Sequence, residues 1–145
     1  MQPDDANAVA AITTRWLRYA TEDLTEAEAM IQRSWYAPRH ACFLAQQGAE
    51  KALKAVLVFL QLDAPRSHNL NALRNLIPPD WPLTQQHPDL TDLTEWAVEA
   101  RYPGEWPDPA AEQAEDAVRQ ARALYDAVQR DLTAHGFKGQ VERNP

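Results

Sequence analysis

The chain has 145 residues, of which 45% are hydrophobic and 24% are charged, and its formal net charge is −7. This length fits a single domain and is too short for a barrel enzyme with a second domain. One cysteine, Cys42, excludes a disulfide framework, and four scattered histidines lack the spacing of a zinc enzyme, so no metal and no cofactor are expected.

Prolines mark the boundaries between the predicted elements. The chain has eleven prolines and only four glycines, and the segments between the prolines are rich in Ala, Leu, Glu, Gln and Arg. These residues are strong helix formers, whereas proline is rarely tolerated inside a helix. In chain order we expect helices over residues 8–32, 39–61, 69–76 and 89–101, and a last helix from Pro109, capped by Asp108, to a stop near Gly136.

Apolar residues recur at three- and four-residue spacing in the long segments, which places them on one face of each helix. The stripe on the second helix contains many alanines, so a neighbouring helix can approach it closely. We therefore expect an all-α fold, an up-and-down antiparallel bundle of about five helices. In the first helix the stripe consists of Trp16, Ala20, Leu24, Ala27 and Ile31.

Residues 77–88 form the only long connection that we expect between helices, and Trp81 and Leu83 within it should pack back onto the bundle. Residues 138–145 carry no packing signal, so we expect one domain over residues 1–137 followed by a flexible tail. The first residues are acidic rather than basic, and no apolar run approaches the length of a membrane span. A soluble, cytoplasmic protein without a membrane segment is the expectation that follows.

Charge is segregated along the chain. Residues 1–32 carry a net charge of −4, residues 33–74 of +4, residues 75–118 of −9, and the remainder of +2. A chain this acidic is a poor general binder of nucleic acid, because Lys and Arg supply most of the affinity for phosphate. The basic segment could still hold a phosphate or RNA, or it could face the acidic segments within the chain or across a dimer.

The most distinctive string is QQGAEKALKA, residues 46–55, on the predicted second helix. Gln46, Glu50 and Lys54 follow one another at four-residue spacing and form one polar ridge. Gln46 also borders the apolar stripe, so it is expected to be partly buried and to need a hydrogen-bond partner. Periodicity alone favours a helix-surface ion pair, which contributes about 0.3–0.5 kcal/mol.

Two further polar strings border the shorter helices. RSHNL, residues 66–70, precedes the third helix, which Ser67 or Asn69 can cap. ARYPG, residues 100–104, ends the fourth helix, where an Arg is favourable beside the negative end of the helix dipole. Structural roles that need no ligand are therefore available to both strings.

Taken together and in this order, the three strings resemble the HEPN domain, and the resemblance covers about residues 14–133. It implies a helical bundle that forms a homodimer and pairs with a small nucleotidyltransferase encoded nearby, as a toxin–antitoxin module. It also points to binding of RNA, a nucleotide or the partner. The residues expected to serve in this binding are Gln46, Glu50, Lys51, Lys54, His68, Arg101 and Tyr102, and all except Lys51 should gather into one cluster.

Many HEPN proteins are metal-independent RNases, and these carry an Arg followed, after four to six residues, by a His. In such a site the His acts as general acid or base on the ribose 2′-hydroxyl, and the Arg stabilises the charge of the phosphorane. Arg130 and His135 have this spacing, with the polar Asp131 after the Arg, and they are the catalytic candidates. Arg33 and His40 have it as well. On an ideal helix Arg130 and His135 would point about 140° apart.

Two hypotheses from different classes follow. The first is a HEPN toxin-type endoribonuclease that its nucleotidyltransferase partner silences. In toxins of this type a Tyr two residues after the His can be adenylylated, and the corresponding position here is Phe137, which has no hydroxyl group. The second is a non-catalytic HEPN module that binds the partner, a nucleotide or RNA. Cys42 lies on the apolar stripe and is interpreted as a core residue rather than a nucleophile.

Overall fold

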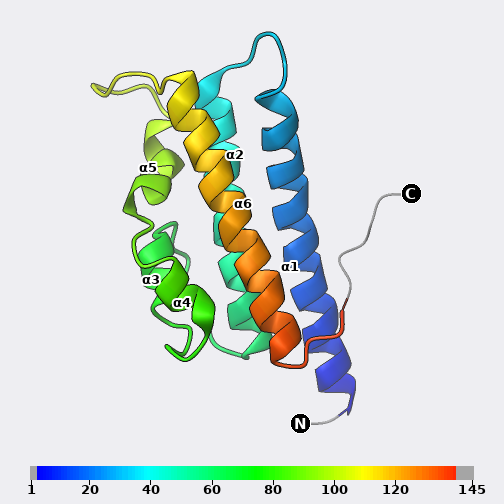
Figure 1. Cartoon of the computed structure of the whole chain (residues 1–145). Helices are drawn as coiled ribbons and strands as arrows, with labels where there is room; N and C mark the ends of the chain where they lie inside the picture. The colour runs from blue at the N-terminus through cyan, green and yellow to red at the C-terminus, as the bar shows by residue number, and fades with distance from the viewer. Residues whose placement is uncertain (1–2, 140–145) are drawn as a thin grey trace.

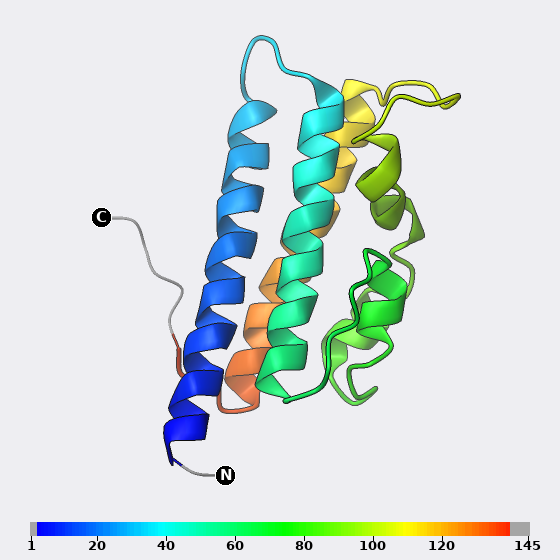
Figure 2. The same ribbon diagram turned by 180° about the vertical axis from the view of Figure 1, so that it is seen from behind.

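Three long helices form the body of the molecule in the computed structural model, which describes residues 3–139. They are α1 (Pro3–Met30), α2 (Pro38–Phe59) and α6 (Ala111–Ala134), and they lie side by side (Figure 1). α1 runs in one direction, whereas α2 and α6 both run in the other (Figures 1 and 2). No helix in this range is both long enough and apolar enough to cross a membrane.

The chain returns from the end of α2 to the start of α6 through three short helices. These are α3 (Leu70–Arg74), α4 (Pro82–Gln86) and α5 (Thr91–Glu99), and they cover one side of the bundle (Figure 2). We call residues 60–110 the return leg. The fold is therefore the all-α, up-and-down bundle that the sequence predicts. The described residues contain six helices rather than five, because α4 lies within the connection expected over residues 77–88.

α4 is capped by a side chain from a distant part of the chain. The buried carboxylate of Asp131 on α6 accepts a hydrogen bond from the backbone N of Leu83 at 2.8 Å. Pro82 lies in the first turn, where its missing N–H group costs nothing. Trp81 and Leu83 are 2% and 0% exposed, which confirms that this segment packs back onto the bundle. The contact that fixes α4 comes from α6, so a local pattern does not reveal it.

α1 and α2 pack closely because small residues line their contact. A Cβ atom at Gly48 would lie only 2.6 Å from Leu24 Cγ and 3.3 Å from the carbonyl oxygen of Ala20. The alanines of the predicted stripe on α2, among them Ala45, Ala49 and Ala52, are fully buried. This stripe thus packs against helices of its own chain and does not by itself indicate a dimer.

α6 begins two residues later than predicted. Its N-cap is Ala110, whose backbone N donates to Oε1 of Gln113 at 2.8 Å, so a glutamine inside the helix satisfies this amide instead of Asp108. The helix ends at Ala134, close to the predicted stop at Gly136, which has a φ of 91°. Most of the predicted tail, residues 138–145, lies outside the described residues.

Two ion pairs join the basic segment of the chain, residues 33–74, to α1. Lys51 Nζ lies 2.6 Å from Asp23 Oδ2, and Arg33 Nη2 lies 3.0 Å from Glu26 Oε1. Between residues 3 and 139 no ion pair connects the basic segment to the acidic segment that follows it. The two segments nevertheless face each other within the chain through hydrogen bonds. Arg39 Nη1 donates to the backbone O of Ala100 at 3.4 Å, and Arg74 Nη1 donates to those of His87 and Pro88 at 2.8 and 2.6 Å.

Cys42 is part of the hydrophobic core, as predicted. Its side chain is fully buried on α2, and burial raises the pKa of its thiol to about 12. A thiol with so high a pKa is protonated at neutral pH and is a poor nucleophile.

Candidate functional site

The candidate site centres on the carboxylate of Glu50. This residue lies on α2 and is only 5% exposed. Oε1 contacts His68 Nδ1 at 2.7 Å and accepts a hydrogen bond from Gln46 Nε2 at 3.2 Å. Oε2 accepts from Lys54 Nζ at 2.9 Å. One buried carboxylate thus contacts three of the predicted site residues, Gln46, Lys54 and His68.

Glu50 is ionised in this environment. Burial acts to raise the pKa of its carboxyl group, but the hydrogen bonds from His68, Lys54 and Gln46, together with the charge of Lys54, outweigh burial and leave the pKa below its usual value. A carboxylate can only accept hydrogen bonds. The proton in the contact with His68 therefore resides on Nδ1 of the imidazole.

The loop before α3 is fixed from both sides, and this fixes His68. Gln46 is fully buried, and its Nε2 also donates to the backbone O of His68 at 3.1 Å. Asn69 caps α3, because its Oδ1 accepts from the backbone N of Ala72 at 3.1 Å. Leu70 N donates to Thr94 Oγ1 on α5 at 3.0 Å. The His68 side chain is itself 60% exposed, so a well-anchored backbone presents the imidazole to solvent.

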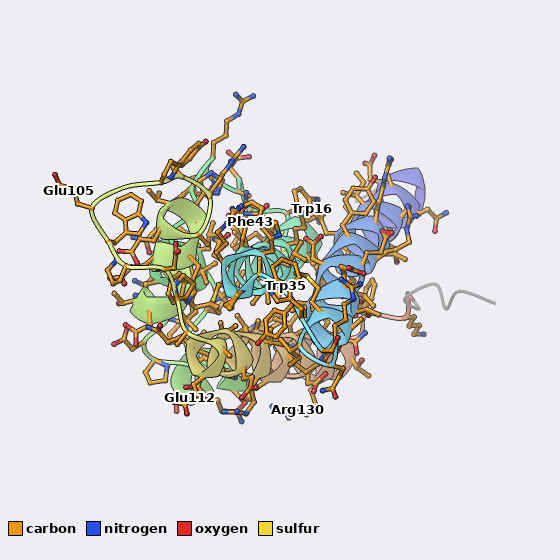
Figure 3. All side chains as sticks on the ribbon, turned by 90° about the horizontal axis from the view of Figure 1, so that it is seen from above. Trp16, Trp35, Phe43, Glu105, Glu112 and Arg130 are labelled. Atoms are coloured by element: carbon orange, nitrogen blue, oxygen red, sulfur yellow. The ribbon has the colours of Figure 1, made fainter. Side chains whose placement is uncertain are left out.

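Aromatic rings pair with cations at Lys54 and, further along α2, at Arg101. Lys54 Nζ lies 5.8 Å from the centroid of the Trp16 ring on α1. Arg101 Cζ lies 5.8 Å from the centroid of Phe43 and 5.3 Å from that of Tyr102. Trp16 and Phe43 project on the same side of the bundle (Figure 3). We call these five residues, with His68, the aromatic–cation surface.

Arg101 and Tyr102 adjoin the Glu50 network without bonding to it. Phe43 lies two turns before Glu50 on α2, on the face of the helix that also carries Gln47 and Lys54. Arg101 therefore extends the surface along α2, while no hydrogen bond joins it to Glu50 within the described part of the chain. A cleft of about 640 Å³ next to Arg101 is lined by the loop that follows α5 and by the start of α2.

Arg130 and His135 lie elsewhere in the molecule. Arg130 Nη2 donates to Gln86 Oε1 at 2.7 Å. The His135 ring stacks on Trp81, with 3.8 Å between centroids, and its Nδ1 lies 2.9 Å from the carbonyl O of Asp131. No hydrogen bond or ion pair connects Arg130 to His135 among the residues described. Arg130 projects from the side of the bundle opposite Trp16 and Phe43 (Figure 3). The role of Arg130 and His135 as a catalytic pair stays a prediction.

Sequence reasoning misses Trp16 and Phe43, two of the three aromatic members of the surface, although it names Tyr102. The pattern places Trp16 on the apolar stripe of the first helix, but its ring is partly exposed and lies beside Lys54. Spacing along one helix cannot reveal a contact between two helices. Lys51, by contrast, is a predicted site residue, and its ammonium group bonds to Asp23 instead of Glu50. Among residues 3–139, no group of His, Cys, Asp and Glu side chains could hold a metal ion.

The helices that carry this site match known proteins over most of their length. The sequence model of the HEPN domain matches residues 13–131. The chain is similar to TT1696 from Thermus thermophilus, whose crystal structure is known. The two sequences are 28% identical and the two structures have a TM-score of 0.67, over 83% of this chain and 98% of that chain. The crystal structure of ST0689, an archaeal HEPN homologue, is 26% identical, with a TM-score of 0.60, over 83% of this chain and 97% of that chain. A search of curated proteins found no match.

Proposed function

Because the chain belongs to the HEPN domain family, we propose that it is the HEPN component of a toxin–antitoxin module and pairs with a small nucleotidyltransferase encoded nearby. Its own role in this module is to bind single-stranded RNA on the aromatic–cation surface. The observation that carries this role is the pairing of accessible aromatic rings with cations around Glu50 and His68.

Single-stranded nucleic acid is bound by two kinds of contact, and this surface offers both. Bases stack on aromatic rings, and each stacked base contributes about 1–3 kcal/mol, while Lys and Arg contact the phosphates. Here Lys54 lies beside Trp16, and Arg101 lies beside Phe43 and Tyr102. The net charge of −7 opposes RNA binding elsewhere on the molecule, so binding depends on this local group.

Fluorescence anisotropy with a labelled single-stranded RNA of about 12 nucleotides, within the usual range of site sizes, tests RNA binding. We expect Arg101→Ala to weaken binding and to reduce the slope of log K against log salt by about 0.7, the value for one phosphate contact with a single strand. Phe43→Ala should weaken binding roughly tenfold through the loss of one stacked base. Arg119→Ala is the matched control, because this Arg is exposed on α6 and pairs with Asp116. An equal effect of Arg119→Ala, or no binding by the unmodified protein, would contradict the proposal.

The turn between α1 and α2 supports the pairing with a nucleotidyltransferase. Trp35 in this turn is 79% exposed and lies at the end of the bundle (Figure 3). Tryptophan is enriched among the residues that dominate binding energy at protein interfaces. In co-purification with the nucleotidyltransferase from the neighbouring reading frame, we expect a complex that Trp35→Ala weakens at least tenfold, about 1.4 kcal/mol. Leu62→Ala is the control, since Leu62 is 41% exposed and follows the other end of α2. An unchanged affinity of the Trp35 variant would exclude this surface.

A homodimer is the third part of the proposal. Besides the family resemblance, Ile12 and Tyr19 on α1 are large hydrophobic residues that are 48% and 38% exposed. Light scattering at micromolar concentration should give twice the mass of one chain. A mass equal to that of one chain would refute the dimer.

A further inference from the structure

We infer that the cleft beside Arg101 binds the terminal phosphate of a single-stranded RNA, so that the strand ends where α2 begins. The inference rests on the RNA binding proposed above and adds a preference for phosphorylated ends to it. The cleft has a volume of about 640 Å³. Its lining consists of Arg39, in the first turn of α2, and of residues between positions 99 and 108, where α5 ends and the next loop begins.

Two arginines line this cleft without a carboxylate partner. Within residues 3–139, the only hydrogen bond of the Arg39 guanidinium runs from Nη1 to the backbone O of Ala100, at a distance of 3.4 Å. The guanidinium of Arg101 lies against the rings of Phe43 and Tyr102 and forms no hydrogen bond or ion pair in the same range. Guanidinium groups bind phosphates with two parallel N–H···O bonds. Both arginines therefore keep donors available for an anion in the cleft.

Trp106 fixes the loop that forms the other wall of the cleft. Its indole Nε1 donates to the backbone O of Glu99 at 2.8 Å. The ring also covers Gly104 so closely that a Cβ atom at this glycine would lie 2.5 Å from Trp106 Cη2. The loop, which carries Glu105 and projects from the bundle (Figure 3), is thus closed on itself. A wall that exists before a ligand arrives lowers the entropic cost of binding, and it presents the ring of Tyr102, which is 53% exposed.

A terminal phosphate suits this pair of arginines better than an internal one. A phosphate monoester carries a charge of about −1.5 to −2 at pH 7 and three acceptor oxygens, whereas an internal phosphodiester carries a single charge. Two guanidinium groups can therefore share one terminal phosphate. Glu99 and Asp108 also line the cleft, and their charges oppose a strand that would continue past the arginines.

The position of the cleft fits a strand that lies along α2. Arg39, Phe43 and Lys54 lie on the same side of this helix, and Lys54 is about 22 Å from Arg39 along its axis. A strand whose bases contact Phe43 and Trp16 therefore has one end at Arg39. The first turn of α2 contains no acidic residue, so the positive end of the helix dipole adds to the charge of Arg39.

Fluorescence anisotropy with three forms of one RNA of about 12 nucleotides, labelled at an internal base, tests the inference on the full chain. One form carries a 5′-phosphate, one carries a 3′-phosphate, and one has hydroxyl groups at both ends. We expect a Kd at least about tenfold lower for a phosphorylated form than for the hydroxyl form, the lower limit for a hydrogen bond to a charged group. The form that binds more tightly identifies the terminus that enters the cleft.

Arg39→Ala separates the cleft from the rest of the RNA surface. This variant should lose the preference and keep the Kd for the hydroxyl form, which also shows that it is folded. Arg33→Ala is the matched control and should retain the preference, because Arg33 lies in the turn before α2, is exposed and pairs with Glu26. A preference that Arg39→Ala retains would place the phosphate elsewhere and overturn the inference.

The three RNA forms also distinguish a missing phosphate site from missing RNA binding. If neither phosphorylated form binds the unmodified protein more tightly than the hydroxyl form does, the terminal-phosphate site is refuted and the RNA-binding proposal survives. If none of the three forms binds, both are refuted.

Discussion

Replacing Glu50 by alanine is expected to lower the free energy of unfolding by about 3 kcal/mol. The substitution removes the acceptor of Gln46, Lys54 and His68 at once. Removing one partner of a buried ion pair costs about 3–5 kcal/mol, because the remaining charge stays buried without compensation. The Lys54 side chain is 14% exposed, so water reaches the stranded ammonium group in part and the loss falls near the lower limit.

Urea denaturation followed by circular dichroism measures this loss. For an m-value of about 1.5–2 kcal/mol per M, a loss of 3 kcal/mol lowers the midpoint by roughly 1.5–2 M. Glu105→Ala is the control, because Glu105 is exposed on the loop between α5 and α6 (Figure 3), and it should change stability by less than about 0.5 kcal/mol. Equal midpoints for the Glu50 and Glu105 variants would refute the argument.

The difference in the free energy of unfolding between Glu50→Ala and the unmodified protein should depend on pH. The pKa of Glu50 is lowered on folding, so its contribution is fully present above the unfolded pKa of about 4.3. That contribution is lost as the pH falls through the lower pKa of the folded state. The two proteins should therefore converge in stability at acidic pH. A difference that grows on acidification would mean that the carboxylate is not the stabilising form.

Three further predictions concern the bundle itself. Gly48→Ala should lower the free energy of unfolding by about 1–3 kcal/mol, because its Cβ would lie 2.6 Å from Leu24 Cγ. Urea denaturation measures this loss, and an unchanged midpoint would show that α1 moves away freely. Asp131→Ala should lower the free energy of unfolding by about 1–3 kcal/mol and speed hydrogen exchange of the Leu83 amide, because this amide loses its buried acceptor. An unchanged exchange rate at Leu83 would rule out the cap. The Cys42 thiol, with a pKa of about 12, should react with a disulfide reagent at pH 8 only after unfolding, and rapid reaction of the folded protein would argue against its place in the core.

The long helices could be predicted from the sequence because their apolar spacing reports burial directly. α4 could not, since Asp131 satisfies its first amide from another helix. The predicted start of α6 lies two residues early for a related reason: Asp108 and Pro109 are typical of a helix start, but Gln113 bonds to the amide of Ala110 instead.

The candidate site was predictable where its contacts follow the helix repeat. Gln46, Glu50 and Lys54 form the expected ridge. His68 contacts Glu50 as well, and it was predicted only because its loop sequence resembles that of the HEPN family. Lys51 lies one turn before Lys54 in the same string, yet it faces Asp23, because side chains three residues apart still differ by about 60° around a helix. Contacts across helices, such as that of Trp16 with Lys54, depend on the packing of α1 against α2.

The division between the three long helices and the return leg has a consequence for motion. The helices of the return leg are five to nine residues long, too short to be stable alone, and they persist only while docked on α2 and α6. Elements of this kind open as a unit at a lower free energy than the core around them. Amides of residues 60–110 should therefore exchange with solvent before those of α1, α2 and α6. His68 belongs to the leg that opens and Glu50 to the helix that stays, so each opening separates the imidazole from its carboxylate while the three long helices remain folded.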